Sequence, residues 1–186
     1  MMHLIKYCSL CGAEVKLDYV DGDNRKRFVC TSCQTIHYTN PKVVVGALVH
    51  WGDQVLLCKR AIEPRYGYWN LPAGYLEDGE KSEDGAAREV MEEAGAEIIL
   101  QGVHVIYNLP QANQVYIHFL AELKDGIYSN GPESIETALF TEGEIPWNEM
   151  AFHTVEFALR RYFADVAAGG DFGLHSTNLV LPQRWN

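Results

Sequence analysis

The sequence predicts a domain of mixed α/β class, with strands and helices in an α+β arrangement, preceded by a small cysteine-rich module. The 186 residues are 47% hydrophobic and 22% charged, which is enough for one good-sized core and a small appendage. Runs typical of strands lie on both sides of a glutamate-rich helical segment. The composition changes after Thr39-Asn40-Pro41, so we expect two domains, residues 1–40 and 41–186.

The first module contains two Cys-x-x-Cys pairs separated by eighteen residues, Cys8 with Cys11 and Cys30 with Cys33. This spacing is typical of a tetrahedral Zn²⁺ site. A module of about 40 residues buries too little apolar surface to fold by packing alone, so structural Zn²⁺ would supply the missing stability. Two disulfides are the alternative, but two Cys-x-x-Cys pairs in a chain that we expect to be intracellular favour a metal site.

Two strands open the second domain. Residues 43–51 and 54–59 are rich in β-forming side chains and are joined by Gly52-Asp53, which predicts a hairpin. Within the second run, Cys58 is most simply a small buried hydrophobic residue. Residues 60–72, RAIEPRYGYWNLP, predict a substrate-facing loop that ends in a short strand.

A helix is predicted over Ser82–Ala94, with Ser82 as its N-cap and Gly95 as a left-handed stop. Three glutamates at spacings i, i+3 and i+4 would share one outward face, toward a cleft: Glu89, Glu92 and Glu93. Ala87, Val90, Met91 and Ala94 form an apolar stripe that we expect to lie against a sheet. A solvated acidic face is the plain alternative for the glutamates.

Further strands are predicted at residues 97–108 and 114–123, with Pro110 in the turn between them, and near residues 137–140. Residues 148–167 carry apolar side chains at helical spacing and predict a C-terminal helix. Residues 169–186 carry no clear signal.

The formal net charge of −10 disfavours general attraction to nucleic acid or to an anionic membrane. A run of eighteen apolar residues and a signal peptide are both missing from the sequence, so we expect a soluble, cytoplasmic protein without membrane contact. An anionic substrate would need bound cations and a local Arg or Lys cluster to reverse the field at its site.

The segment from Gly74 to Ala96 resembles the complete Nudix box, G-x5-E-x7-R-E-U-x-E-E-x-G-U with U aliphatic. The constrained positions are filled by Gly74, Glu80, Arg88, Glu89, Val90, Glu92, Glu93, Gly95 and Ala96. Ala96 is the weakest match, because a larger aliphatic residue is usual there. The resemblance implies a Nudix fold over about residues 42–165, a mixed β-sheet between helices, while the cysteine pairs resemble a zinc ribbon.

The Nudix resemblance implies Mg²⁺-dependent hydrolysis of a nucleoside diphosphate linked to another moiety, by attack of water on phosphorus. A charged phosphoanhydride and scarce hydroxide both call for cations, and Mg²⁺ or Mn²⁺ suits a carboxylate cage. We assign Glu89, Glu92 and Glu93 as ligands, with a backbone carbonyl near Ala73 as an addition. Arg88 would orient a carboxylate such as Glu80 rather than touch substrate.

The general base is either a box glutamate or an acid on a later loop, where Glu133 and Glu136 are the candidates. We favour Glu133, because it lies in a Gly-Pro loop able to close over the site. The residues expected to act in catalysis are therefore Glu92, Glu93, Glu133 and Arg88.

Substrate contacts are expected from the loop before the box. Arg60 and Arg65 could clamp phosphate, and Tyr66, Tyr68 or Trp69 could stack on a base or an isoalloxazine ring. The alternative is that the aromatic residues close the edge of the core and the arginines lie on its rim.

The ribbon and the run His37-Tyr38-Thr39-Asn40-Pro41 resemble a group whose plant members hydrolyse FAD and ADP-ribose. Pro110, which follows the box, resembles a proline that is characteristic of ADP-ribose-hydrolysing relatives. The SQPWPFP-type run of NADH diphosphatases has no counterpart in residues 97–115. We therefore rank ADP-ribose or FAD above NADH or capped RNA.

Two other roles remain open for the ribbon. It could make the chain a non-catalytic nucleotide sensor that reports to RNA, DNA or protein, although all box carboxylates are present. It could also serve as a dimerisation or docking element in an enzyme, which would make the chain a homodimer.

Overall fold

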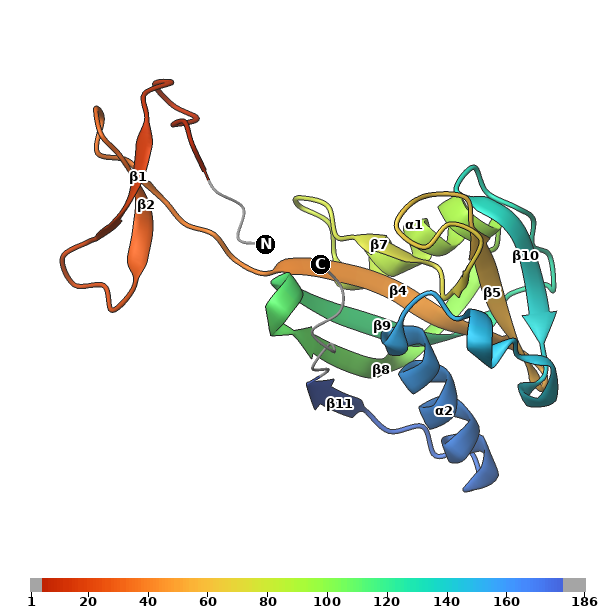
Figure 1. The fold of residues 1–186 in the computed structure, drawn as a ribbon. Helices are drawn as coiled ribbons and strands as arrows, with labels where there is room; N and C mark the ends of the chain where they lie inside the picture. Colours follow the sequence, from red (N-terminus) through yellow and green to blue (C-terminus); the bar gives the residue numbers. More distant parts are fainter. Residues whose placement is uncertain (1–4, 179–186) are drawn as a thin grey trace. The chain divides into compact units, whose positions relative to one another are not determined.

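The computed structural model describes residues 5–178 and divides into two units, Met1–Pro41 and Lys42–Asn186 (Figure 1). The first unit is an antiparallel sheet in the order β1-β2-β3, formed by β1 (Val15–Tyr19), β2 (Lys26–Cys30) and β3 (Ile36–His37). Its buried apolar residues are few: Cys8, Phe28, Val29 and Cys30. Packing alone therefore gives this unit little stability.

The four ribbon cysteines converge at one end of this sheet. The Sγ atom of Cys11 lies 3.4 Å from those of Cys30 and Cys33, and the Cys8 and Cys33 sulfurs are 3.7 Å apart. A disulfide would hold them at about 2.05 Å. Zn–S bonds of about 2.3 Å in a tetrahedron separate thiolates by about 3.8 Å. The cluster therefore has the dimensions of a zinc site and is not disulfide-bonded.

The second unit is built on a mixed sheet in the order β10-β5-β4-β9-β8-β11. Its strands are β4 (Lys42–Trp51), β5 (Gln54–Arg60), β8 (Ile98–Leu109), β9 (Gln114–Leu123), β10 (Ser134–Phe140) and β11 (His175–Asn178). The β4–β9 and β8–β11 pairs are parallel, and the other pairs along this order are antiparallel. Two short strands join it, β6 (Trp69–Asn70) on β5 and β7 (Ala73–Tyr75) on β4.

Two helices, α1 (Ser82–Ala94) and α2 (His153–Ala167), cover opposite faces of this sheet (Figure 1). Along β4, Val45 and Val49 pack with α1, while Leu48 packs in the cluster that contains α2. This alternation follows from the two-residue period of a strand. The mixed sheet between helices is thus confirmed. Within residues 5–178, neither helix is long and apolar enough to cross a membrane.

The helix α1 ends as predicted but begins differently. Gly95 adopts the left-handed conformation, with φ 55°, and its N–H donates to the carbonyl of Met91. Ser82, expected as the N-cap, is instead the first helical residue, and its hydroxyl donates to Glu83. Lys81 takes the cap position without a side-chain hydrogen bond. The first turn is therefore favoured by acidic residues near the helix dipole rather than by a cap.

The C-terminal part differs more from the prediction. Helix α2 begins at His153 rather than Asn148, because the chain first forms a 3₁₀ turn over Trp147–Glu149. Ala151 N–H then donates to the carbonyl of Trp69, which holds the chain extended before the helix. Part of the tail without sequence signal forms β11, and residues 179–186 lie outside the described part.

Thiol chemistry tests the ribbon. After chelation under native conditions, we expect four thiols to react with a disulfide reagent such as DTNB. Cys58 should react only on denaturation, because its side chain is buried and burial raises its pKa to about 12. A Cys58→Ala variant should give four thiols in both states. Unreactive ribbon thiols that appear only after reduction would contradict a metal site.

Candidate active site

The loop before α1 lies directly against the helix. Gly74 is in β7, paired with Val45 of β4, and a Cβ atom on it would collide with the carboxylate of Glu89. The glycine is therefore required by close approach rather than by an unusual backbone angle. This contact places the backbone of β7 beside the acidic face of α1.

The glutamates of α1 do not share one outward face, which corrects the prediction. Glu89 and Glu93 are each only 8% exposed, whereas the Glu92 side chain is 56% exposed. The apolar stripe is also rotated: Ala86, Val90 and Ala94 pack on the sheet, while Met91 is exposed. Residues 89 and 93 follow the same helical spacing as this stripe, so the sheet-facing side of α1 carries two carboxylates.

Arg88 binds three carboxylates and a carbonyl. Its Nε donates to Glu80 at 2.8 Å, and its Nη1 donates to Glu89 at 2.8 Å and Glu92 at 3.1 Å. Its Nη2 donates to the carbonyl of Tyr75 at 3.1 Å. The guanidinium thus joins the loop to the helix, and Glu80 is the partner that the sequence suggested for it.

The buried carboxylates have perturbed pKa values. Burial raises the pKa of Glu89, although the hydrogen bond and charge of Arg88 oppose the shift. Burial and then the neighbouring charge of Glu89 raise the pKa of Glu93 to about 8, with Arg60 acting in the opposite direction. Both glutamates are therefore costly to ionise together unless a further cation joins them.

Most of the predicted site residues line a cleft of about 620 Å³. Its lining includes Arg60, Ala73, Arg88, Glu89, Glu92, Glu93 and Glu133. Glu133 belongs to this lining, and its charge contributes to the raised pKa of both Glu89 and Glu93. Glu136 is outside this lining, on β10, with its carboxylate 3.9 Å from the Lys59 ammonium.

The loop that carries Glu133 is fastened to the end of α1. Gly131 N–H and the Ser134 hydroxyl both donate to the carbonyl of Glu93, at 3.0 and 2.7 Å. A Cβ on Gly131 would collide with the carbonyl of Glu92, so only glycine fits this approach. Glu133 is therefore held at the cleft by hydrogen bonds, whereas the sequence suggested a closing loop.

The donor set fits a divalent cation. Oxygen ligands from several carboxylates suit hard cations such as Mg²⁺, and the buried carboxyls of Glu89 and Glu93 keep raised pKa values even with Arg88 and Arg60 in the lining. Ala73 lines the cleft, and its backbone also stabilises the charged form of Glu93. The carboxylates present can therefore hold a metal, and Ala73 lies at the same cleft.

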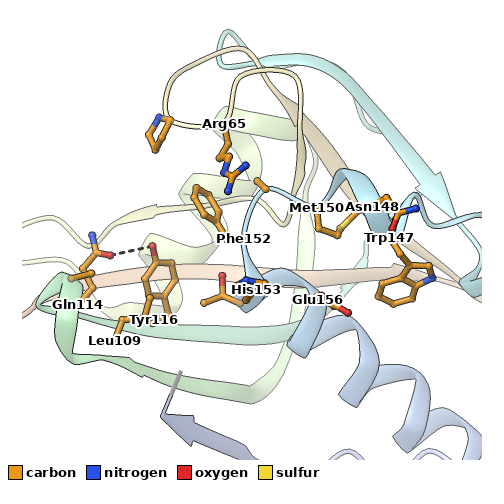
Figure 2. A pocket seen from close by; sticks show the side chains of 14 residues that line it. Arg65, Leu109, Gln114, Tyr116, Trp147, Asn148, Met150, Phe152, His153 and Glu156 are labelled. Carbon is orange, nitrogen blue, oxygen red and sulfur yellow. Dashed lines mark hydrogen bonds between the residues drawn. The ribbon is translucent and has the colours of Figure 1, made fainter. Parts of the chain in front are cut away.

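A second cavity of about 490 Å³ adjoins the acidic cleft (Figure 2). Phe152, Tyr116 and Gln114 line both spaces, and Figure 2 shows the hydrogen bond from Tyr116 to Gln114. The lining of the second cavity also includes Leu109, Trp147 and Met150. Most of these side chains are apolar or aromatic, which is typical of a site for a ring system.

The substrate residues predicted before the box lie in different places. Arg60 lines the acidic cleft, and its guanidinium is 5.4 Å from the centroid of the Phe152 ring. Arg65 lines the second cavity and lies over the Tyr68 ring. Tyr66 and Tyr68 are partly exposed but line neither cavity.

Trp69 cannot stack on a substrate, which is a further correction. It is 4% exposed and makes an edge contact with Phe140 in the core. The aromatic residues that line the second cavity, Tyr116, Trp147 and Phe152, were missed because they come from separate segments without a motif. For Trp147 and Phe152, the aromatic residues spaced along 147–157 were a sequence signal, which does not extend to Tyr116.

Stability against pH tests the electrostatics of Glu93. A carboxyl whose pKa is raised to about 8 stabilises the fold fully below its unfolded value of about 4.5, and this contribution is lost as pH rises through 8. Without divalent cations, we expect wild type to lose thermal stability relative to Glu93→Gln as pH rises from about 4.5 to about 8, and no further above 8. Mn²⁺ should raise the thermal stability of wild type at high pH and should leave that of the variant unchanged. Parallel pH curves would contradict this electrostatic description.

Comparison with known proteins gives the family. The Nudix N-terminal family matches residues 6–39, and the NUDIX domain family matches residues 40–164. The crystal structure of a NUDIX hydrolase from Nitrosomonas europaea is 46% identical, with a TM-score of 0.88, over 94% of this chain and 100% of that chain.

Two curated relatives are more distant. The NAD-capped RNA hydrolase NudC of Photobacterium profundum is 28% identical over 151 residues, 78% of this chain and 53% of its own. The ADP-ribose pyrophosphatase of Methanocaldococcus jannaschii is 27% identical over 113 residues, 59% of this chain and 67% of its own. The chain thus spans about half the length of the NudC relative. With its box, mixed sheet and ribbon all in place, the chain belongs to the Nudix family.

Proposed function

We propose that the chain hydrolyses the pyrophosphate bond of a nucleoside diphosphate linked to another moiety, with ADP-ribose or FAD as substrate. The products are AMP and a second phosphorylated compound. One observation carries this proposal: a cleft lined by six glutamates adjoins an aromatic cavity of about 490 Å³. The cleft suits cations and a diphosphate, and the cavity suits a ring. The similarity to an ADP-ribose pyrophosphatase gives further support.

In this proposal, Glu89, Glu92 and Glu93 hold Mg²⁺ or Mn²⁺, together with the backbone carbonyl of Ala73. When bound there, such a cation would neutralise the diphosphate oxygens and would lower the pKa of a water molecule. Arg88 is a positioning residue, because its hydrogen bonds hold Glu89 and Glu92.

The remaining roles follow from what lines the cleft. Glu133 accepts the proton of the attacking water, since it lines the cleft, whereas Glu136 lies outside the cleft and pairs with Lys59. Arg60 contacts the diphosphate and also closes over Phe152, so it can orient phosphate and ring together. Arg65 and Phe152 contact the ring moiety in the second cavity.

Hydrolysis of NADH or of NAD-capped RNA is the second candidate. It is favoured by relatives named NAD-capped RNA hydrolase NudC, one of which, from Stutzerimonas stutzeri (strain A1501), is 32% identical over 135 residues. Both substrates contain the same diphosphate linkage, so the acidic cleft suits them equally. The net charge of −10 disfavours a long RNA.

A substrate panel tests the proposal. The protein would be incubated with ADP-ribose, FAD, NADH, diadenosine phosphates and NAD-capped RNA, with Mg²⁺ or Mn²⁺. We expect AMP release to be fastest from ADP-ribose or FAD and to require the divalent cation, because the cleft alone repels a diphosphate. Faster turnover of NADH or NAD-capped RNA would select the second candidate. Release of no nucleotide from any of them would refute the hydrolase proposal.

A matched pair of glutamate variants tests the metal assignment. Glu92→Gln should lower kcat by about 100-fold or more, the equivalent of about 2.7 kcal/mol of transition-state stabilisation. Glu136→Gln should leave turnover close to wild type, since this equally exposed residue lies outside the cleft. Circular dichroism would verify that both variants fold. Near-wild-type activity of Glu92→Gln would remove it from the metal site.

A further inference from the structure

A second group of metal-ligand side chains lies outside both cavities. His104 comes from β8, Asp165 from α2 and His175 from β11. One ligand atom from each residue lies within 4.8 Å of the others. The three residues belong to different elements, so only the fold brings them together.

The local backbone explains how His104 reaches this position. Val103 pairs with Phe119 and Val105 with His118, so His104 is an extra residue in a β-bulge. As a result, His104 and Val105 are both buried, whereas a regular strand would turn neighbours to opposite faces. Val105 also pairs with His175 of β11, which places the second histidine beside the bulge.

Asp165 completes the group from the helix. Its carboxylate accepts a hydrogen bond from His175 Nε2 at 2.7 Å, and the rings of His104 and His175 are 5.3 Å apart in an edge-to-face arrangement. His104 is 1% exposed, yet neither of its ring nitrogens has a hydrogen-bond partner. The backbone of Ala158 and Gly173 lies nearby without a well-directed hydrogen bond.

We propose that His104, Asp165 and His175 bind a zinc-class transition-metal ion. Two imidazoles and one carboxylate are a borderline donor set that suits Zn²⁺ and not Mg²⁺. A ring nitrogen of His104 would donate its lone pair to the ion. Without an ion, this nitrogen is buried and has no hydrogen-bond partner. Asp165 and His175 are partly exposed, so water can fill a fourth position. Zn–ligand bonds of about 2.0–2.2 Å require small rotations that draw the three side chains together.

Such an ion would anchor β11, a polar strand at the edge of the sheet. β11 has the sequence His-Ser-Thr-Asn and buries little apolar surface, so its attachment depends on pairing with β8. A metal that joins β8, α2 and β11 would stabilise the segment after α2. This role is separate from the ribbon and from the proposed hydrolysis.

The rival explanation is an ion pair between His175 and Asp165 beside an unsatisfied core histidine. Metal analysis of the full-length chain separates the two. Protein incubated with Zn²⁺ in excess Mg²⁺, which occupies the acidic cleft, would be desalted and its zinc measured by mass spectrometry. We expect two zinc ions per wild-type chain, one in the ribbon and one in the histidine cluster.

Three variants complete the test. Asp165→Asn and His175→Ala should each bind one zinc ion fewer than wild type, while Asp171→Asn, which removes an exposed acid from the same segment, should match wild type. Hydrogen exchange of the β11 amides should slow on zinc addition in wild type and Asp171→Asn only. Equal zinc content in wild type and Asp165→Asn, or zinc-independent exchange in wild type, would overturn the proposal.

Discussion

The rest of the site depends on the hydrogen bonds that the Arg88 guanidinium makes. It bonds to Glu80 and to the carbonyl of Tyr75 in the loop, and to Glu89 and Glu92 in the helix. In a chain with a net charge of −10, one fixed cation thus gathers three carboxylates. Without it, the carboxylates of Glu80, Glu89 and Glu92 would lose their shared hydrogen-bond donor.

Arg88 neutralises only part of this acidic group. Glu93 lies beyond its hydrogen bonds, has a raised pKa, and shares the cleft with Glu133. Arg60 also lines the cleft and acts on Glu93, but the lining contains more glutamates than arginines. An exchangeable cation can therefore neutralise the negative charge that remains. The fold tolerates this arrangement because α1 is otherwise well packed through Ala86, Val90 and Ala94.

The sequence predicted the parts of the fold that depend on local patterns. The hairpin of β4 and β5 and the end of α1 at Gly95 follow from local patterns, and the resemblance to the box suggested the pairing of Arg88 with Glu80. Which side of α1 faces the sheet did not, because Glu89 and Glu93 follow the same period as Val90 and Ala94. The start of α2 also depends on a tertiary hydrogen bond between Ala151 and Trp69, which no local pattern reveals.

The same distinction explains why the box is informative about chemistry and silent about substrate. Its carboxylates are arranged by one helix and one loop, so spacing in sequence becomes spacing in the cleft. The aromatic cavity that we propose for the ring moiety is instead assembled from Tyr116 on β9, Trp147 in a 3₁₀ turn and Phe152 before α2. Arg60 connects the two regions, because it lines the cleft and lies over Phe152. Substrate choice therefore depends on residues whose proximity only the folded chain creates.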